Sequence, residues 1–364
     1  MNKQRVIHVV QHLSPGGLES LVLDIVQFSQ SNTLIVSLEG TKDEALAKWP
    51  KLNQYKNKLS FLNKQPGVQL PLLVTLHKVF KTLQPDVVHT HHIGPLLYAG
   101  FAAKTAGVAH CIHTEHDAWH LHSLKRRALE SAALKLVRPH LVADAKQVGR
   151  EVQRFFPSQN VKTILNGIDT QRFVEGHKSD ARACFGLPQH ATIIGSAGRL
   201  EHVKGHDVLI SALMLLPKTT HLAIAGDGSQ FLTLRKQVDK LNLSERVHFV
   251  GRVDQVERFY QALDIFCLPS RNEGYPLTAL EAQACGIPTA VTNVGSSHET
   301  LCPHTGMLIK ANNIPDMAIC LQRMMTQIQQ NTPSPRTFVC AHNDIRDMVT
   351  TYEQLVCSQP AIFA

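Results

Sequence analysis

The chain has 364 residues, of which 43% are hydrophobic, and a formal net charge of +8. This length predicts two domains of ordinary size, each with its own core. No apolar stretch reaches the roughly 18 residues that a membrane-spanning helix needs, so the sequence gives no indication of one.

The basic excess lies entirely in the first half of the chain. Residues 1–170 contain 20 Lys and Arg against 12 Asp and Glu, whereas residues 171–364 contain 17 of each kind. This asymmetry is typical of an anionic partner such as a membrane surface or a phosphorylated acceptor, and equally of an ordinary basic surface. Aromatic residues make up only 6% of the chain, and no nucleic-acid-binding motif accompanies the charge. We therefore expect no nucleic acid partner.

The eight cysteines are scattered without a Cys-x2-Cys pair, which indicates reduced thiols. The first apolar run is short and stops at Ser14-Pro15-Gly16-Gly17, so it predicts a strand and not a signal peptide. We expect a cytoplasmic protein, and the basic first half leaves peripheral attachment to the inner face of a membrane open.

Strand and helix patterns alternate along both halves. In the first half, strands are predicted at residues 5–13, 33–38, 85–92 and 109–116, and helices at 18–29 and 72–84. In the second half, strands are predicted at residues 191–200, 220–229, 246–251, 264–270 and 287–293, and helices at 206–217, 231–243, 256–263 and 276–286. Such alternation predicts two α/β domains with parallel sheets, each Rossmann-like.

A turn-rich segment, LNGIDTQRF, separates the two alternating blocks. It predicts an N-terminal domain at 1–168 and a C-terminal domain at 169–343, and we expect a helix at about 344–364 to cross back onto the first domain. Two such domains in series predict a central cleft, with ligands bound beyond the carboxyl ends of the strands.

The loop GSAGRLEHVKG, residues 195–205, connects a predicted strand to a helix. Arg199 and Lys204 lie five residues apart in this glycine-flanked turn, so both can converge on one anion. A diphosphate concentrates negative charge, and a clamp of Arg and Lys suits it. The alternative is a pair of solvated basic side chains.

The segment SRNEGYPLTALEAQACGIPTAVT, residues 270–292, places Glu273 in a loop and Glu281 on the helix that follows. Gly274 permits a tight backbone, and Pro276 suits the first turn of a helix. Carboxylates accept hydrogen bonds from paired hydroxyls, so one Glu can face a sugar and the other a ribose. The alternative for Glu281 is an exposed helix residue, which its apolar neighbours disfavour.

Together, GRLEHVKG and EGYPLTALE resemble the retaining glycosyltransferases of family 4, which have the two-domain GT-B architecture. The resemblance extends to PGGLES, PDVVHTHH, NGID, AGDGS, HFVGRVD and the Glu-x7-Glu motif itself. It covers most of the chain and is specific for the family, but not for its substrates.

The resemblance implies a set of site residues. Arg199 and Lys204 would hold the donor diphosphate and act in catalysis, Glu273 would contact the transferred sugar, and Glu281 would bind the ribose. The remaining residues implied to contact the donor are Gly16 and Gly17 beside the phosphates, Arg252 and Val253 near the nucleobase, and the loop residues Gly274, Tyr275, Pro276 and Leu277.

Histidines are abundant, 21 in all, and several follow the strands of the first half. Family members carry a His-Thr pair that faces the reacting sugar. His113-Thr114 matches that pair, with His116 as the neighbour that could replace His113. The spacing of His113, His116 and His120 could also suggest a metal site, but no acid or Cys pattern completes a signature, and we expect no metal. The chain also has no Asp-x-Asp motif, which fits a donor site without a cation.

The expected function is transfer of a hexose-type sugar from a nucleotide diphosphate sugar, UDP ahead of GDP, to a glycan or lipid-linked acceptor in cell-surface polysaccharide or glycolipid synthesis. Family resemblance implies retention of anomeric configuration and no bound cofactor. The alternatives are an epimerase or phosphorylase of the same architecture, or a non-catalytic nucleotide-sugar-binding subunit. The segment at residues 121–140 predicts a basic helix able to lie on anionic lipid, or else an ordinary solvated helix face.

Overall fold

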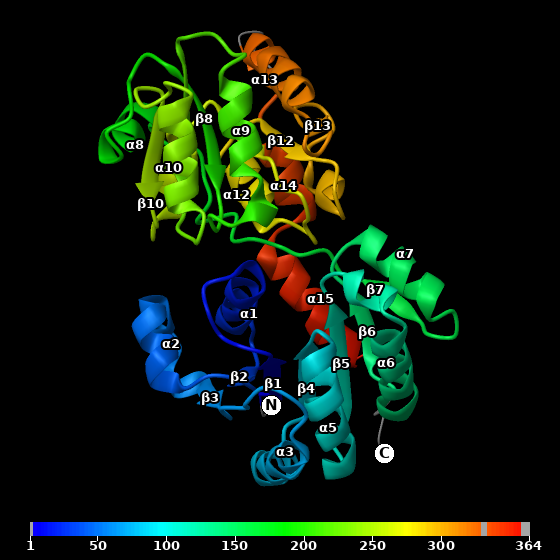
Figure 1. Ribbon diagram of the computed structural model, residues 1–364. Coiled ribbons are helices and arrows are strands. Elements are labelled where there is room, and N and C mark those ends of the chain that lie inside the picture. Colours follow the sequence, from blue (N-terminus) through cyan, green and yellow to red (C-terminus); the bar gives the residue numbers. More distant parts are fainter. Residues whose placement is uncertain (1–2, 329–332, 358–364) are drawn as a thin grey trace. The chain divides into compact units, whose positions relative to one another are not determined.

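The computed structural model describes residues 3–328 and 333–357 (Figure 1). It divides into two compact units. Unit 1 comprises the described residues up to Gly167 together with those from Ile345 onward, and unit 2 runs from Ile168 to Asp344. The last part of the expected C-terminal helix, residues 358–364, lies outside the described residues.

Unit 1 is built on a seven-stranded parallel sheet with the order β3-β2-β1-β4-β5-β6-β7. Its strands are β1 (Arg5–Val10), β2 (Asn32–Ser37), β3 (Leu59–Phe61), β4 (Val87–His91), β5 (His110–Glu115), β6 (His140–Ala143) and β7 (Val161–Thr163). The central strands β1, β4 and β5 are buried over most of their length, as expected for a parallel sheet covered on both faces.

Helices cover both faces of this sheet (Figure 1). They are α1 (Gly17–Phe28), α2 (Lys42–Lys48), η1 (Pro50–Lys58), α3 (Leu70–Leu83), α4 (Ile93–Pro95), η2 (Leu96–Gly100), α5 (Phe101–Ala106), η3 (Trp119–His122), α6 (Leu124–Val137), α7 (Lys146–Phe155) and α15 (Ile345–Cys357). Helix α15 packs against α1, and Ser29 donates a hydrogen bond of 2.9 Å to Glu353. The last helix of the chain is therefore part of the first unit.

Unit 2 has a six-stranded parallel sheet with the order β10-β9-β8-β11-β12-β13. Its strands are β8 (Thr192–Ala197), β9 (Thr220–Ala225), β10 (Val247–Gly251), β11 (Ile265–Leu268), β12 (Thr289–Thr292) and β13 (Met307–Ile309). The order turns back between β8 and β11, which is the topological switch point of a Rossmann-type sheet.

The helices of unit 2 also lie on both faces of their sheet (Figure 1). They are α8 (Lys178–Cys184), η4 (His202–Lys204), α9 (His206–Leu213), α10 (Phe231–Lys240), α11 (Val256–Gln261), α12 (Leu277–Ala284), η5 (Ser297–Thr300), α13 (Ile314–Ile328) and α14 (Arg336–His342). Helices α9, α10 and α13 share one apolar core with the sheet. The expected fold class, two parallel-sheet α/β domains, is confirmed.

Among the residues that the structure describes, no helix combines the length and apolarity needed to span a bilayer.

Candidate functional site

The two loops singled out in the sequence leave unit 2 at its switch point. One follows β8 and the other follows β11, and these two strands pair directly. Parallel strands all end at the same edge of a sheet, so the loops after neighbouring strands emerge side by side. The strand order therefore accounts for how residues some seventy positions apart can share one site.

Lys204 and Glu273 are in direct contact. Lys204 Nζ lies 2.6 Å from Glu273 Oε1, and the Ser270 hydroxyl donates a second hydrogen bond of 2.6 Å to the same oxygen. Both side chains are largely covered, with 20% of Lys204 and 10% of Glu273 exposed. A charge-assisted bond in such surroundings is stronger than an exposed ion pair. The cation and the acid therefore form one polar centre.

A glycine and an Arg–Asp pair hold the two loops together. Gly205 has φ +67°, and a Cβ there would overlap the carbonyl oxygen of Pro269. Arg271 donates two hydrogen bonds, of 2.8 and 2.7 Å, to Asp207 at the start of α9. Burial opposes ionisation of Asp207, yet the Arg271 guanidinium holds the pKa of that carboxyl below its usual range. The sequence pattern did not indicate these roles of Gly205, Arg271 and Asp207, although Arg271 stands only two residues before Glu273.

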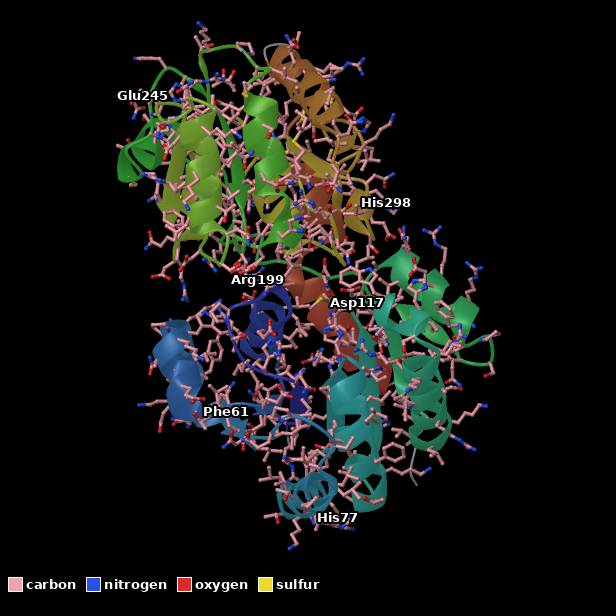
Figure 2. The ribbon with its side chains drawn as sticks, viewed as in Figure 1. Phe61, His77, Asp117, Arg199, Glu245 and His298 are labelled. Carbon is pink, nitrogen blue, oxygen red and sulfur yellow. The ribbon has the colours of Figure 1, made fainter. Side chains whose placement is uncertain are left out.

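Arg199 is exposed in the loop after β8, at the edge of its unit (Figure 2). Among the described residues, no carboxylate lies within ion-pair distance of its guanidinium. Two neighbouring residues hold the loop in place. Leu200 is buried, and Glu201 accepts hydrogen bonds from the backbone amide and the hydroxyl of Ser229. Those bonds from Ser229 lower the pKa of Glu201. Arg199 thus projects from a fixed loop with its charge available.

His206 follows Gly205 and is buried with both ring nitrogens lacking a hydrogen bond from any described residue. Burial, followed by the charge of Lys204, lowers the pKa of His206 to about 4. The His206 ring is therefore uncharged at neutral pH, and it adds no positive charge next to Lys204.

Glu281 lies on α12, where it meets a buried tyrosine. The Tyr260 hydroxyl donates a hydrogen bond of 2.7 Å to Glu281 Oε2. Burial and the Glu281 charge raise the pKa of Tyr260 well above its usual value. Glu281 is thus half-buried and held in place, in line with the expectation that it is not a freely exposed helix residue. Tyr260 gave no signal in the sequence.

The segment between the two glutamates is fixed by its backbone. Gly274 accepts a hydrogen bond of 3.1 Å from the Ser296 amide, and a Cβ on Gly295 would overlap the carbonyl oxygen of Glu273. Gly295 has φ +50°, so this close approach needs glycine.

The start of α12 differs slightly from the sequence prediction. Pro276 is the residue that caps the helix, and the first helical residue is Leu277. Tyr275 is buried, and its hydroxyl accepts a hydrogen bond of 2.8 Å from Asn343. The first amides of a helix have no partner within it, so they point toward the loops at the sheet edge.

The remaining residues predicted to contact the donor lie in two places. Arg252 and Val253 follow β10 and leave unit 2 at the same carboxyl edge. Gly16 and Gly17 belong to unit 1, where Gly16 precedes α1 and Gly17 begins it. A Cβ on Gly16 would overlap the Glu19 carboxylate, whereas a Cβ on Gly17 would meet no atom within 4 Å.

His113 is enclosed within unit 1. Its Nδ1 lies 2.9 Å from the Thr90 hydroxyl and its Nε2 lies 2.6 Å from Glu115 Oε1, so both ring nitrogens are engaged. Burial lowers the pKa of His113 to about 4. The direct catalytic role of His113 stays a prediction, and in this structure both of its ring nitrogens already have partners.

His116 follows the end of β5 and belongs to a different polar chain. Its Nε2 lies 3.2 Å from His91 Nδ1 and its Nδ1 lies 3.1 Å from Asp144 Oδ2, which also accepts a hydrogen bond of 2.7 Å from Asn166. The chain continues from His91 to His8 at 3.4 Å. His116, Asp144 and Asn166 follow β5, β6 and β7, at the carboxyl edge of the unit 1 sheet. The sequence pattern gave no indication that Asp144 and Asn166 belong to this chain of polar contacts.

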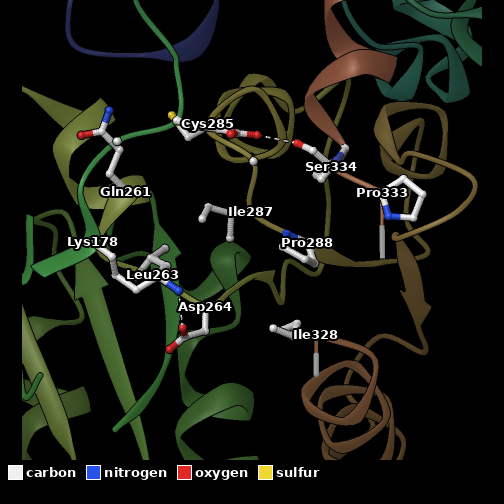
Figure 3. A pocket seen from close by; sticks show the side chains of 14 residues that line it. Lys178, Gln261, Leu263, Asp264, Cys285, Ile287, Pro288, Ile328, Pro333 and Ser334 are labelled. Carbon is white, nitrogen blue, oxygen red and sulfur yellow. Dashed lines mark hydrogen bonds and ion pairs between the residues drawn. The ribbon is translucent and has the colours of Figure 1, made fainter. Parts of the chain in front are cut away.

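A cavity of about 330 Å³ in unit 2 lies at the other edge of the sheet (Figure 3). Asp264 and Pro288, which line it, immediately precede β11 and β12. The Lys178–Asp264 ion pair of 2.7 Å closes part of its wall. Since ligands of open α/β sheets bind at the carboxyl edge, this cavity is separate from the Lys204–Glu273 centre.

The fold and the polar centre define a two-domain α/β protein with a cationic and acidic site at the carboxyl edge of its second sheet. Residues 15–172 match the family described as Glycosyltransferase Family 4, and residues 178–332 match the family described as Glycosyl transferases group 1. The chain belongs to the family 4-type glycosyltransferases of GT-B architecture.

Individual relatives agree with this family. Lipopolysaccharide core biosynthesis mannosyltransferase LpsB of Rhizobium meliloti (strain 1021) is 35% identical over 172 residues, 42% of this chain and 47% of the relative. D-inositol 3-phosphate glycosyltransferase of Mycolicibacterium smegmatis is 30% identical over 266 residues, 66% of this chain and 59% of the relative. The chain thus spans about half the length of these curated relatives.

A solved structure shares the fold over nearly the whole chain. Anabaena HepE in complex with UDP superposes with a TM-score of 0.84 at 19% identity, covering 98% of this chain and 100% of that one. At this identity the likeness concerns the architecture alone.

Proposed function

We propose that this protein transfers a hexose from a nucleotide diphosphate sugar to a hydroxyl of a glycan or lipid-linked acceptor in cell-surface polysaccharide or glycolipid synthesis. The observation that carries the proposal is the contact between Lys204 and Glu273 at the switch point of the unit 2 sheet. The relative named as a lipopolysaccharide core mannosyltransferase supports the substrate class. The neighbour solved with UDP supports UDP ahead of GDP as the nucleotide.

The chemistry follows from the charges in the two loops. As the bond from the anomeric carbon to the phosphate breaks, negative charge builds on the departing phosphate oxygen. Lys204 and Arg199 would then stabilise the transition state more than the bound substrate. Glu273 would accept hydrogen bonds from the sugar hydroxyls, and Glu281, held by Tyr260, would accept them from the ribose.

Retention of configuration and independence from a donor-site metal are part of the proposal. The acceptor hydroxyl would attack on the face that the phosphate leaves, and the departing phosphate would take its proton. The two cations, together with the first amides of α12, would neutralise the diphosphate without a divalent ion. Of the histidines, His116 is kept for the sugar-facing position because it follows β5 at the carboxyl edge of the sheet, although both of its ring nitrogens also have partners within unit 1.

The acceptor is assigned to unit 1. Exposed leucines and basic residues alternate along α6, which favours an anionic lipid surface as the place where a lipid-linked acceptor is met. The relative named for D-inositol 3-phosphate supports a phosphorylated acceptor as a further member of the substrate class.

The test compares Lys204→Ala with Lys178→Ala. Both lysines form ion pairs in unit 2, with Glu273 at 2.6 Å and with Asp264 at 2.7 Å, but only Lys204 lies at the carboxyl edge. Loss of the Lys204 charge should reduce kcat/KM for sugar transfer about 100- to 1000-fold, the range seen when one transition-state donor is removed. Lys178→Ala should retain the activity of the unchanged protein.

The donor is first identified by a thermal-shift screen across UDP- and GDP-hexoses, since a ligand that binds the folded state raises its melting temperature. Transfer is then measured with radiolabelled donor and a lipid-linked glycan acceptor pool, beside a reaction with donor alone. Near-normal transfer by Lys204→Ala would overturn the diphosphate role. Isomerised donor in the reaction without acceptor would indicate an epimerase instead.

A further inference from the structure

Unit 1 contains a second cluster of chemistry-bearing side chains that the proposed transfer reaction does not use. His113 and Glu115 come from β5, His120 from η3 and Glu130 from α6. The side chains of His113, Glu115 and Glu130 are fully buried, and His120 is 9% exposed. Two carboxylates and two imidazoles therefore share one site beneath the surface.

The four side chains face one another through the atoms that ligate metals. His113 Nε2 lies 2.6 Å from Glu115 Oε1, and His120 Nε2 lies 2.6 Å from Glu130 Oε2. His120 Nε2 also lies 3.9 Å from Glu115 Oε2, which links the two pairs. His113, Glu115 and Glu130 each offer one possible ligand atom, and these three atoms lie within 4.8 Å of one another. This spacing lets one ion reach these three side chains after small shifts. His120 is not one of the three, and its ring must move along its contacts with Glu130 and Glu115 to reach the same ion.

Two carboxylate oxygens in the cluster accept no hydrogen bond from the described residues. Glu115 Oε2 and Glu130 Oε1 are buried, and neither accepts a hydrogen bond from any residue that the structure describes. Leaving a buried carboxylate oxygen unsatisfied is costly, more so than for a neutral group. A cation between the two glutamates would satisfy both oxygens at once.

The outer nitrogen of each histidine is held as in known metal sites. The Thr90 hydroxyl donates to the carbonyl of Ile112 at 3.2 Å, so it accepts from the His113 Nδ1–H at 2.9 Å. This leaves the Nε2 lone pair of His113 directed at the glutamates. On His120, Nδ1 forms an ion pair of 3.6 Å with Oδ1 of Asp117, the residue labelled in Figure 2. Metal-ligating histidines are oriented in this way by a hydroxyl, carbonyl or carboxylate behind them.

We propose that His113, Glu115, His120 and Glu130 hold one Zn²⁺ ion in a structural site. Four nitrogen and oxygen ligands from the protein suit the tetrahedral coordination of zinc and leave no open position. Two glutamates balance the double charge of the ion, so the buried centre is neutral. The ion fastens η3 and α6 to the end of β5, one residue before His116. It is separate from the donor diphosphate and so is compatible with transfer that needs no donor-site metal.

The sequence alone did not indicate this site, because the histidine spacing lacked acidic partners. Glu115 was read only as part of a strand, and Glu130 comes from a helix ten residues beyond His120. The pairing of β5 with β6, followed by the packing of α6, is what brings the acids to the histidines.

The test begins with the metal content of the full-length protein, purified without a polyhistidine tag and without added metal. Inductively coupled plasma mass spectrometry should find about one zinc ion per chain, and dialysis against a chelator followed by Zn²⁺ alone should restore it. X-ray absorption at the zinc edge should show only nitrogen and oxygen ligands at about 2.0–2.1 Å. Sulfur ligands would overturn the assignment, because the proposed set contains no Cys.

Variants then locate the ion. Glu130→Gln keeps the shape and a hydrogen-bonding group opposite His120 but removes a charged ligand, and zinc should fall from about one to less than about 0.1 ion per chain. The matched control is His91→Gln in the other buried histidine group, formed by His8, His89 and His91, which should keep one zinc. Amide hydrogen exchange in α6 should accelerate on chelation in the unchanged protein and stay insensitive to the chelator in Glu130→Gln.

Besides sulfur ligands, three outcomes would overturn the proposal. The first is zinc below about 0.1 ion per chain before and after incubation with Zn²⁺. The second is full zinc retention by Glu130→Gln, and the third is loss of zinc from His91→Gln alone, which would place the ion in the other group.

Discussion

Gly205 shows how a single residue sets the donor-side geometry. Its φ of +67° is in the left-handed region, and the carbonyl of Pro269 leaves no room for a Cβ. Gly186 offers a matched comparison, because its φ is +61° while no atom lies within 4 Å of the position a Cβ would take. The two glycines share a backbone conformation and differ only in what surrounds them.

We predict that Gly205→Ala destabilises unit 2 more than Gly186→Ala does. In both variants an Ala residue must adopt a positive φ, which costs about 1 kcal/mol of stability. Gly205→Ala must in addition move the loop that carries Ser270 and Glu273. Its additional loss should be on the order of 2 kcal/mol. Urea unfolding measures the difference, and sugar transfer should fall only in Gly205→Ala. Equal stability losses would mean that the Pro269 contact imposes no constraint.

At the same scale, the sequence could indicate Lys204 and Glu273 but not what holds them. Their roles follow from their charge and from the motifs in their loops, and both of these can be recognised in the sequence. Ser270, Asp207 and Tyr260 act through contacts made only after β8 and β11 pair and α11 packs beside α12. The partners of His113 could not be predicted for the same reason. A His-Thr pair at a strand end does not reveal which residue lies inside the sheet.

At the scale of elements, several helices and buried strands were predicted, but the 15-residue helix α13 and the buried strand β6 were not. Helix α3 and strand β8 are continuous apolar patterns at the expected spacing, and the structure has them within a few residues of the prediction. Strands β3, β7 and β13 were missed because each has only three residues and exists through pairing with a longer neighbour. Periodicity cannot be detected over so short a run.

We predict that helix α6 binds to anionic lipid bilayers. Leu124, Leu129 and Leu136 are 71%, 54% and 51% exposed, and exposed basic residues stand among them: Lys125, Arg126, Lys135 and Arg138. Apolar side chains and basic charge on one exposed side bind anionic bilayers. Removing Lys125 and Arg126 together should weaken binding by roughly 2 kcal/mol, about thirtyfold.

Co-sedimentation with vesicles containing phosphatidylglycerol or only phosphatidylcholine measures this binding. Leu129→Ser should weaken it as well, whereas Leu232→Ser should not, although Leu232 is 70% exposed on α10 of unit 2. Binding that is equal for anionic and neutral vesicles, or equally weakened by the two leucine variants, would remove α6 as the lipid-facing surface.

For the whole molecule, the two units differ in how many neutral histidines they bury. His8, His89 and His91 are enclosed between the unit 1 sheet and α15, and the polar groups facing them are His116, Thr114 and Tyr352. Burial lowers the pKa of His8 to about 4 and that of His89 and His91 well below the usual 6.5. In unit 2, the one histidine among the described residues that is this deeply buried is His206, which is 2% exposed.

This difference predicts that acid unfolds unit 1 before unit 2. Between pH 6.5 and about 4, these histidines are protonated in the unfolded chain but not in the folded one, so unfolding takes up protons. Stability is therefore complete above pH 6.5 and decreases as the pH falls, by up to about 1.4 kcal/mol per pH unit for each such histidine. Burial lowers the pKa of His92 and His116 in unit 1 to about 3 as well, so unit 1 should lose stability several times as steeply as unit 2. Amide hydrogen exchange at pH 7.5 and 5, followed separately in β4 and in β8, measures how steeply the stability of each unit falls with pH.

Replacing His8 with Leu should reduce the number of protons that unit 1 takes up on unfolding by one, so its stability should fall less steeply with pH. An unchanged slope would show that His8 is not one of the groups that take up a proton on unfolding.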